Sequence, residues 1–292
     1  MKKKVALLTV SALLIASLAA CGSSSDEEDT EETSVETEAA DESTEDTEAE
    51  EEEADSSESD MAYVQEKGTL VVGITDFEPM DYKDDDGNWI GFDADLATAF
   101  AEYLGVEVEF VEIDWDNKIL ELDAQSIDCV WNGMTLTDEV MSAMSCSNAY
   151  LNNAQIVVLP ADIADDYADE DSLSELAFAV ETGSAGEAEA EDRGWTYTSV
   201  ESQAAALLEV ASGTSDAAII DSLMAAAMVG EGTSYEDLTY TVSLSDEEYG
   251  VGFRTGSDLT EELNSFLEQC YDDGTLTEIA ETYGVQAALI EQ

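Results

Sequence analysis

Four consecutive residues, Asn132-Gly133-Met134-Thr135, have types and spacing suited to holding a small charged solute. They follow an apolar run at 127–131 that predicts a buried strand, so they fall at its carboxyl end. Gly133 allows the backbone to approach a ligand closely, and its carbonyl could accept a hydrogen bond from an ammonium group. The Thr135 hydroxyl could donate to a carboxylate. This segment is therefore a candidate binding loop.

A second candidate loop, Thr182-Gly183-Ser184-Ala185-Gly186, opens a predicted helix. N–H groups at a helix N-terminus attract anions, so the amides of Ser184 and Ala185 suit a carboxylate. Asp221 ends a further apolar run, and its side chain could cap the helix that is predicted from Ser222 onward. These features again lie where a predicted strand ends.

Predicted strands and helices alternate along the chain from about residue 61. The strands are expected at 69–74, 106–113, 127–131 and 177–180, and the helices at 93–104, 117–124, 202–211 and 222–229. Such alternation predicts parallel βαβ units, in which ligands bind outside the carboxyl ends of the strands. A succession of helix, tight turn, aspartate and buried strand occurs at 120–131 and again at 208–220. We therefore expect two similar α/β halves.

Two tryptophans differ in their expected roles. Trp115 lies between a predicted strand and a predicted helix, where either ligand contact or core packing remains open. Trp131 lies inside a predicted strand, so we expect it in the core.

The composition restricts the class of function. The sequence has 71 Asp and Glu residues against eight Lys and Arg residues and no histidine. Nucleic acid is an implausible partner, because phosphate binding needs clustered cations. The lack of histidine removes the commonest general base and metal ligand, so we expect no catalytic residue, no metal and no cofactor. Besides Cys21 there are Cys129, Cys146 and Cys270, and the sequence leaves open whether Cys129 and Cys146 pair.

The N-terminus has the pattern of a secretory signal. Three lysines precede an apolar run at 5–18 that is too short to cross a bilayer. Cys21 follows Leu18-Ala19-Ala20, which resembles a lipobox and implies a signal peptide over 1–20 with lipidation of Cys21. The acidic segment at 21–60 contains no aromatic residue, so we expect a disordered linker there.

A series of motifs resembles the family 3 extracellular solute-binding proteins, which serve polar amino-acid ABC importers. One motif, Gly91-Phe92-Asp93-Ala94-Asp95-Leu96-Ala97, opens the first long helix. The others lie at 68–73, 77–80, 115–116, 128–137, 181–186, 215–221, 249–254 and 273–279. Together the motifs cover about residues 64–285.

The resemblance implies an α/β, two-lobe periplasmic-binding-protein type II fold with a ligand cleft between the lobes. Two strands should cross between the lobes, near 152–155 and 245–249. The first lobe would then comprise 62–152 and 248–292, and the second lobe 153–247.

The resemblance also implies roles for individual side chains. Phe77 would stack on the ligand, and Asp221 would pair with the ligand's α-ammonium group. With the loops described above, the expected ligand-binding residues are Phe77, Trp115, Asn132, Gly133, Met134, Thr135, Thr182, Ser184, Ala185 and Asp221.

One position departs from the family pattern. Relatives usually carry an arginine that grips the α-carboxylate bidentately, where this chain has Val140. Losing such a charge-assisted pair costs roughly 1.5–3 kcal/mol. Lys118 could replace the arginine, or the ligand could be a cationic amine without an α-carboxylate. The retained Asp221 favours an amino-acid-like ligand.

The hypothesis from the sequence is a monomeric lipoprotein on the extracellular face of the bacterial cell membrane, anchored at Cys21. It would capture an amino acid or related solute and deliver it to the permease and ATPase of an ABC importer. A ligand sensor or scaffold that kept the fold is the first alternative, favoured by Val140. An enzyme similar to cyclohexadienyl dehydratases is the second, and the lack of histidine opposes it.

Overall fold

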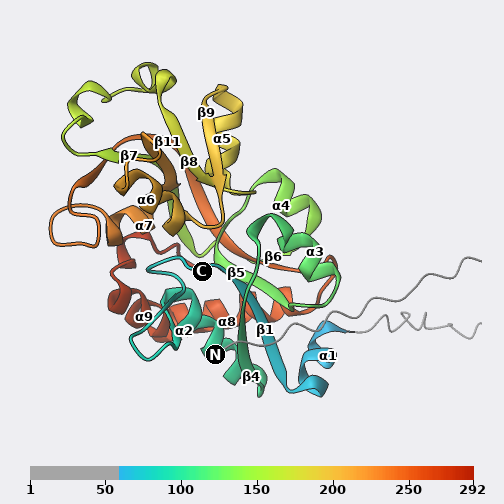
Figure 1. Cartoon of the computed structure of the whole chain (residues 1–292). Coiled ribbons are helices and arrows are strands. Elements are labelled where there is room, and N and C mark those ends of the chain that lie inside the picture. Colours follow the sequence, from blue (N-terminus) through green and yellow to red (C-terminus); the bar gives the residue numbers. More distant parts are fainter. Residues whose placement is uncertain (1–58) are drawn as a thin grey trace, which may run out of the picture. The chain divides into compact units, whose positions relative to one another are not determined.

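The computed structural model describes residues 59–292 (Figure 1). Cys21, the signal peptide at 1–20 and nearly all of the predicted linker therefore lie outside the described residues. The described part begins with α1 (Asp60–Lys67), a helix that the sequence analysis does not predict. The Ser59 hydroxyl caps it by accepting from the Ala62 amide, and Gly68 ends it in a left-handed conformation. Between residues 59 and 292, no helix has the length and apolar character that a membrane span requires.

Residues 59–292 contain a nine-stranded sheet in the order β4-β1-β5-β11-β7-β10-β8-β9, with β6 paired to β11. We call β4, β1 and β5 the first half-sheet and β10, β8 and β9 the second half-sheet. Within each half-sheet the strands run parallel, as the βαβ pattern predicts. The strands are β1 (Thr69–Ile74), β4 (Glu107–Glu112), β5 (Cys129–Thr135), β6 (Ser145–Cys146), β7 (Leu151–Pro160), β8 (Ala177–Glu181), β9 (Thr196–Val200), β10 (Ala217–Asp221) and β11 (Leu238–Phe253).

The long strands β7 and β11 connect the two half-sheets. They pair antiparallel from Leu238 opposite Pro160 to Tyr249 opposite Leu151. At one side β11 pairs with β5, and at the other side β7 pairs with β10. The two segments expected to cross between the lobes, 152–155 and 245–249, thus lie within this central pair. The division into lobes at 152/153 and 247/248 stays a prediction.

Helices cover both half-sheets (Figure 1). In the first, α2 (Phe92–Leu104) packs on β4 and β5 and against α9 (Thr275–Tyr283), which adjoins α8 (Leu259–Asp273). In the second, α5 (Ala185–Arg193) and α6 (Gln203–Ala211) pack on β8 and β10. The remaining short elements are β2 (Tyr82–Lys83), β3 (Trp89–Ile90), η1 (Trp115–Asn117), α3 (Lys118–Asp123), α4 (Asp138–Ala143), η2 (Ala164–Asp166), η3 (Glu170–Glu175), α7 (Ser222–Met228) and η4 (Gln286–Ala288).

The cores of the two half-sheets are built from the apolar runs of their strands. Trp131 is fully buried, with ring centroids 6.2 Å from Phe100 and 6.5 Å from Tyr150, so its expected core position is confirmed. A separate apolar cluster contains Trp115, Met134 and Val140 and packs beside the ends of β4 and β5. These side chains bury their apolar surface there and stabilise the loops that follow the strands.

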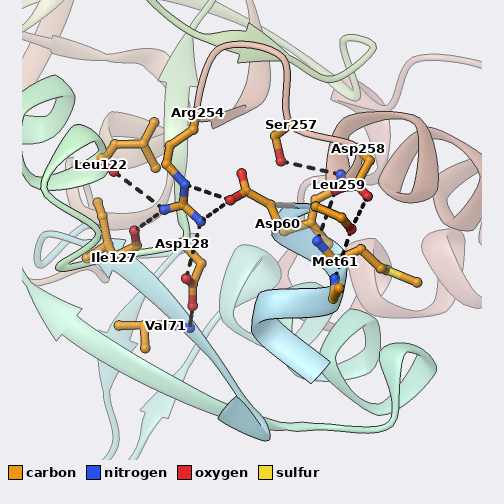
Figure 2. A network of polar contacts seen from close by, with 12 residues as sticks. Asp60, Met61, Val71, Leu122, Ile127, Asp128, Arg254, Ser257, Asp258 and Leu259 are labelled. Atoms are coloured by element: carbon orange, nitrogen blue, oxygen red, sulfur yellow. Dashed lines mark hydrogen bonds and ion pairs between the residues drawn. The ribbon is translucent and has the colours of Figure 1, made fainter. Parts of the chain in front are cut away.

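A network of charged side chains holds the start of α1 (Figure 2). The Arg254 guanidinium donates to the Asp60 carboxylate at 2.9 Å and to the Ile127 carbonyl at 2.8 Å, and it lies 3.6 Å from Asp128. The Lys67 ammonium donates to the other oxygen of Asp128 at 2.6 Å. We call Asp60, Lys67, Asp128 and Arg254 the N-terminal ion network. Each of its buried carboxylates has a cation beside it, as burial of charge requires.

Candidate ligand-binding site

A cavity of about 410 Å³ lies where strands of the two half-sheets end. Phe77 follows β1, Trp115 follows β4, and Met134 belongs to the end of β5. From the second half-sheet, Glu181 ends β8 and Asp221 ends β10. Both sets of strands therefore direct their carboxyl ends to one space, which is the expected position of a ligand in an open α/β sheet.

The cavity gathers most of the side chains that the sequence singles out. Thr182 does not line it, because both its amide and its hydroxyl donate to the Val200 carbonyl, each at 3.0 Å. That the lining residues bind a ligand stays a prediction. The predicted residues that line the cavity are Phe77, Trp115, Lys118, Asn132, Gly133, Met134, Thr135, Val140, Ser184, Ala185 and Asp221.

The segment at 132–135, which was predicted to follow the strand as a loop, instead lies within β5 (Cys129–Thr135), because the strand pairs with β11 up to Thr135. Asn132 and Gly133 are held from behind by buried polar groups. The Asn132 carboxamide accepts from the Thr75 amide at 2.9 Å and donates to the Asp81 carboxylate at 2.7 Å, so its polar atoms tie β5 to the end of β1. Gly133 has a φ of +55°, and a Cβ there would lie 2.6 Å from the Phe77 ring. Glycine is therefore needed to seat Phe77 against the loop.

Asp221 is fixed by amide side chains. The Gln155 amide donates to its carboxylate at 2.7 Å, and the amides of Asn153 and Gln203 donate to it as well. Asp221 is the N-cap residue of α7, but its side chain makes no cap hydrogen bond to that helix. Burial, together with the nearby Glu247 carboxylate, raises the pKa of Asp221 to about 7.

Glu247, on the crossing strand β11, shares the same donors. Its carboxylate accepts from Gln155 at 2.9 Å, Asn153 at 3.1 Å and the Thr135 hydroxyl at 3.0 Å. Burial raises the pKa of this carboxyl group too. Asn153 and Gln155 thus donate to two carboxylates at once.

Glu181 completes the acidic wall. Its side chain is 3% exposed, and its Oε1 has no hydrogen-bond partner among residues 59–292. Burial, together with the Asp221 carboxylate, raises the pKa of Glu181 to about 8. We call Glu181, Asp221 and Glu247, with the donors Asn153 and Gln155, the cavity acid network.

Lys118 is the only basic residue that lines the cavity among residues 59–292. Its ammonium lies 4.9 Å from the centre of the Trp115 ring and donates to the Trp115 carbonyl at 3.2 Å. It also donates to the Gly183 carbonyl at 3.0 Å, so it joins η1 of one half to the β8–α5 loop of the other. Burial lowers its pKa, against the opposing effect of Glu181.

Comparison with known proteins places the chain in a family. The sequence model of the bacterial extracellular solute-binding proteins, family 3, matches residues 70–286. The chain belongs to this family. The resemblance that the motifs indicate is thereby confirmed.

Relatives and solved structures agree with this membership. The solute-binding protein is 31% identical over 225 residues to the arginine-binding extracellular protein ArtP of Bacillus subtilis, covering 73% of this chain and 85% of ArtP. It is 27% identical to the L-cystine-binding protein TcyJ of Escherichia coli, covering 75% of this chain and 84% of TcyJ. The crystal structure of a mutant of ArgBP from T. maritima matches with a TM-score of 0.71 and 30% identity, covering 77% and 98% of the two chains. The solute-binding protein therefore has the expected type II fold with a cleft between two lobes.

Four polar residues around Asp221 in this solute-binding protein were not predicted from the sequence. Glu247 and Asn153 face each other across β7 and β11, and Gln155 lies next to them. Gln203 donates from α6, which reaches Asp221 only because the helix packs on β10. The one signal in the sequence is that Gln155 directly precedes the apolar run at 156–159. A polar side chain beside such a run is expected to be buried and therefore to need a hydrogen-bond partner, and Gln155 is indeed buried.

Among residues 59–292, no group of three or more histidine, cysteine, aspartate or glutamate side chains is arranged to hold a metal ion. Cys129, Cys146 and Cys270 are all free thiols, which answers the question of whether the first two pair. The chemistry that the cavity offers is therefore that of charges, amides and aromatic faces.

Proposed function

We propose that this solute-binding protein is the substrate-binding lipoprotein of an ABC importer and captures an amino acid or amino-acid-like small solute in the cavity. The observation that carries the proposal is Asp221, a buried carboxylate held in place at the cavity wall by three amide side chains. Such a group suits a ligand ammonium, while Phe77 and Trp115 can cover the apolar part of a ligand. The arginine-binding and cystine-binding relatives support the same ligand class.

The anchoring part of the proposal rests on the sequence before residue 59. Cys21 would carry the lipid and hold a monomer at the extracellular face of the membrane, with the acidic linker as a spacer. Labelling with a radioactive fatty acid should mark the wild-type chain and leave Cys21→Ser unlabelled. Equal labelling of the two chains would contradict lipidation at Cys21.

Ligand screening tests the proposed binding. We expect at least one amino acid, or an amine of similar size, to raise the melting temperature of the chain without its signal peptide. A ligand at 100 times its Kd adds about 2.7 kcal/mol to the free energy of unfolding. Calorimetry should then give one ligand per chain. If no compound of this class stabilises the chain, the proposal fails.

A sensor or scaffold that kept the fold is the second candidate, and Val140 at the usual arginine position is the observation that favours it. Uptake of the identified ligand by whole cells separates the two. Cells that lack the chain should lose high-affinity uptake if it serves an importer, whereas unchanged uptake would indicate a sensor. We also propose that the chain is not an enzyme, so incubation with prephenate-like acids should leave them unconverted.

A further inference from the structure

The wall of the cavity carries an excess of acidic side chains. Seven carboxyl groups line it against the single ammonium of Lys118 among residues 59–292. Glu181 and Asp221 are the two buried ones, at the ends of the adjacent strands β8 and β10. The others come from η1, α4 and α5: Asp116, Asp138, Glu139, Glu187 and Glu191. A ligand carboxylate entering this space would meet repulsion from most of the wall.

Three of the donors that could hold a ligand carboxylate, on Thr135, Ser184 and Lys118, already make hydrogen bonds within the protein. The Thr135 hydroxyl donates to Glu247 at 3.0 Å, and the Ser184 amide donates to the Glu181 carbonyl at 3.2 Å. Lys118 donates to two backbone carbonyls. Val140 contributes only an apolar surface. An anionic ligand that used these three donors would have to break their hydrogen bonds within the protein before it formed its own.

The α5 N-terminus is occupied as well. The Glu187 carboxylate, one turn into the helix, accepts from the Gly183 amide at 2.7 Å. The Ser184 hydroxyl caps the helix by accepting from the Glu187 amide at 3.1 Å. A carboxylate of the protein therefore already lies at the α5 N-terminus and interacts favourably with the helix dipole.

Acceptors, in contrast, remain available. Glu181 Oε1 is buried and without a hydrogen-bond partner among residues 59–292, although the residue lines the cavity. An unpartnered buried carboxylate is costly, and a cationic donor on a ligand would remove that cost. Asp221 lies beside it, close enough that its charge raises the pKa of Glu181. Together they form a site for a positive group.

We infer that the ligand is a small organic dication without a carboxylate, such as a diamine or a guanidino-amine. One cationic group is held between Glu181 and Asp221, and the other is balanced by the remaining carboxylates of the wall. Phe77, Trp115 and Met134 cover the connecting methylene chain. This inference rests on the proposed function and names the ligand class of the same site.

Matched pairs of compounds test the inference on the wild-type chain by calorimetry. Lysine and 1,5-diaminopentane differ only in the carboxylate, as do arginine and agmatine. We expect each carboxylate-free member to bind at least tenfold more tightly than its amino acid. Pentylamine, with one cationic group, should bind at least tenfold more weakly than 1,5-diaminopentane.

A variant then locates the inner cation site. Glu181→Gln keeps the shape of the side chain and should weaken the better-binding compound at least tenfold. Glu175→Gln, an exposed glutamate outside the cavity, serves as the matched control and should bind like wild type. An unchanged affinity in a folded Glu181→Gln variant overturns the role of Glu181.

The remaining outcomes separate this inference from the proposed function. Equal or tighter binding of lysine or arginine overturns the carboxylate-free class and leaves a solute-binding protein for amino acids. Equal binding of pentylamine and 1,5-diaminopentane overturns the second cationic group. If neither these compounds nor any amino acid binds, both the inference and the proposed function fail.

Discussion

Two of the regions in which buried carboxylates gather neutralise them in different ways. In the N-terminal ion network, Asp60 and Asp128 lie against Arg254 (Figure 2), and Asp128 also pairs with Lys67. In the cavity acid network, the neighbours of the carboxylates are mainly amides and other carboxylates, and the pKa of Glu181 rises to about 8. The first region is complete without a ligand. In the second, the one nearby cation among residues 59–292, Lys118, donates to backbone carbonyls, and no cation pairs directly with Glu181 or Asp221, which fits the ligand cation that we infer.

The largest expected effect comes from removing the cation of the complete region. Arg254→Leu leaves Asp60 without its cation and leaves Asp128 with Lys67 alone. Breaking such a buried pair costs about 3–5 kcal/mol. Urea unfolding measures the loss. Lys83→Met, which breaks the exposed pair with Glu112, is the control and should cost less than about 1 kcal/mol. Equal losses in the two variants would mean that the N-terminal ion network contributes no more than a surface pair.

Asp221→Ala removes a carboxylate of the cavity acid network and should weaken ligand binding. Removing the carboxylate leaves the ligand cation without its partner in a buried place, so we expect the affinity for any ammonium-bearing ligand to fall at least 100-fold, about 3 kcal/mol. Asp216→Ala, at the other end of the same strand, is the control, because Asp216 accepts from the Ala177 amide outside the cavity. Calorimetry that finds Asp221→Ala within threefold of wild type would refute Asp221 as the anchor.

Val140→Arg adds a guanidinium group to the cavity that contains the cavity acid network. For a ligand without a carboxylate we expect about tenfold weaker binding, because the guanidinium would compete for the same carboxylates. Val140→Met changes the apolar packing without adding charge and should bind within threefold of wild type. Tighter binding by a folded Val140→Arg chain would instead indicate a ligand with a carboxylate, which the sequence alone favoured.

The pH dependence of stability tests the cavity acid network in the ligand-free chain. Glu181 faces Asp221 from β10 and Lys118 from α3, and burial with the Asp221 charge raises its pKa to about 8. The unfolded chain releases this proton near pH 4, so the folded chain binds more protons between about pH 4 and 8. The contribution of Glu181 to the free energy of unfolding therefore falls as pH rises through that window, by at most about 1.4 kcal/mol per pH unit.

Urea unfolding of the ligand-free chain at pH 5, 6, 7 and 8 measures this slope. Glu181→Gln should lose less stability per pH unit than wild type, and Glu175→Gln should match wild type. Indistinguishable slopes for wild type and Glu181→Gln would show that Glu181 does not hold an extra proton in the folded chain.

The sequence predicted the parts of this protein that depend on local pattern. Apolar runs identified β1, β4, β5, β8 and β10, and Gly105 marked the end of α2. Asn132 and Asp221, at or near the carboxyl ends of β5 and β10, line the cavity. The N-terminal helix α1 was missed because its eight residues carry a weak apolar stripe, with Val64 as its buried apolar residue.

What the sequence could not supply depends on pairing between distant segments. Glu247 and Asn153 are neighbours only because β11 and β7 pair in one register, and a shift of one residue would turn both side chains to the other face. Thr182 was placed in the cavity because it shares a turn with Ser184, but its side chain turns toward Val200 of β9. Only the structure shows which hydrogen-bond donors of the cavity are already used within the protein. The charge that we infer for the ligand depends on that information.

One glycine determines how near the two sides of the cavity can come. Gly183, with a φ of +72°, lies against η1 of the opposite half, and a Cβ built on it would be 2.8 Å from the Asp116 Cα. At position 183 there is therefore room for the hydrogen atom of glycine but not for a larger side chain. A side chain introduced at 183 would therefore push η1 and the β8–α5 loop apart and leave the cavity wider than it is in this structure.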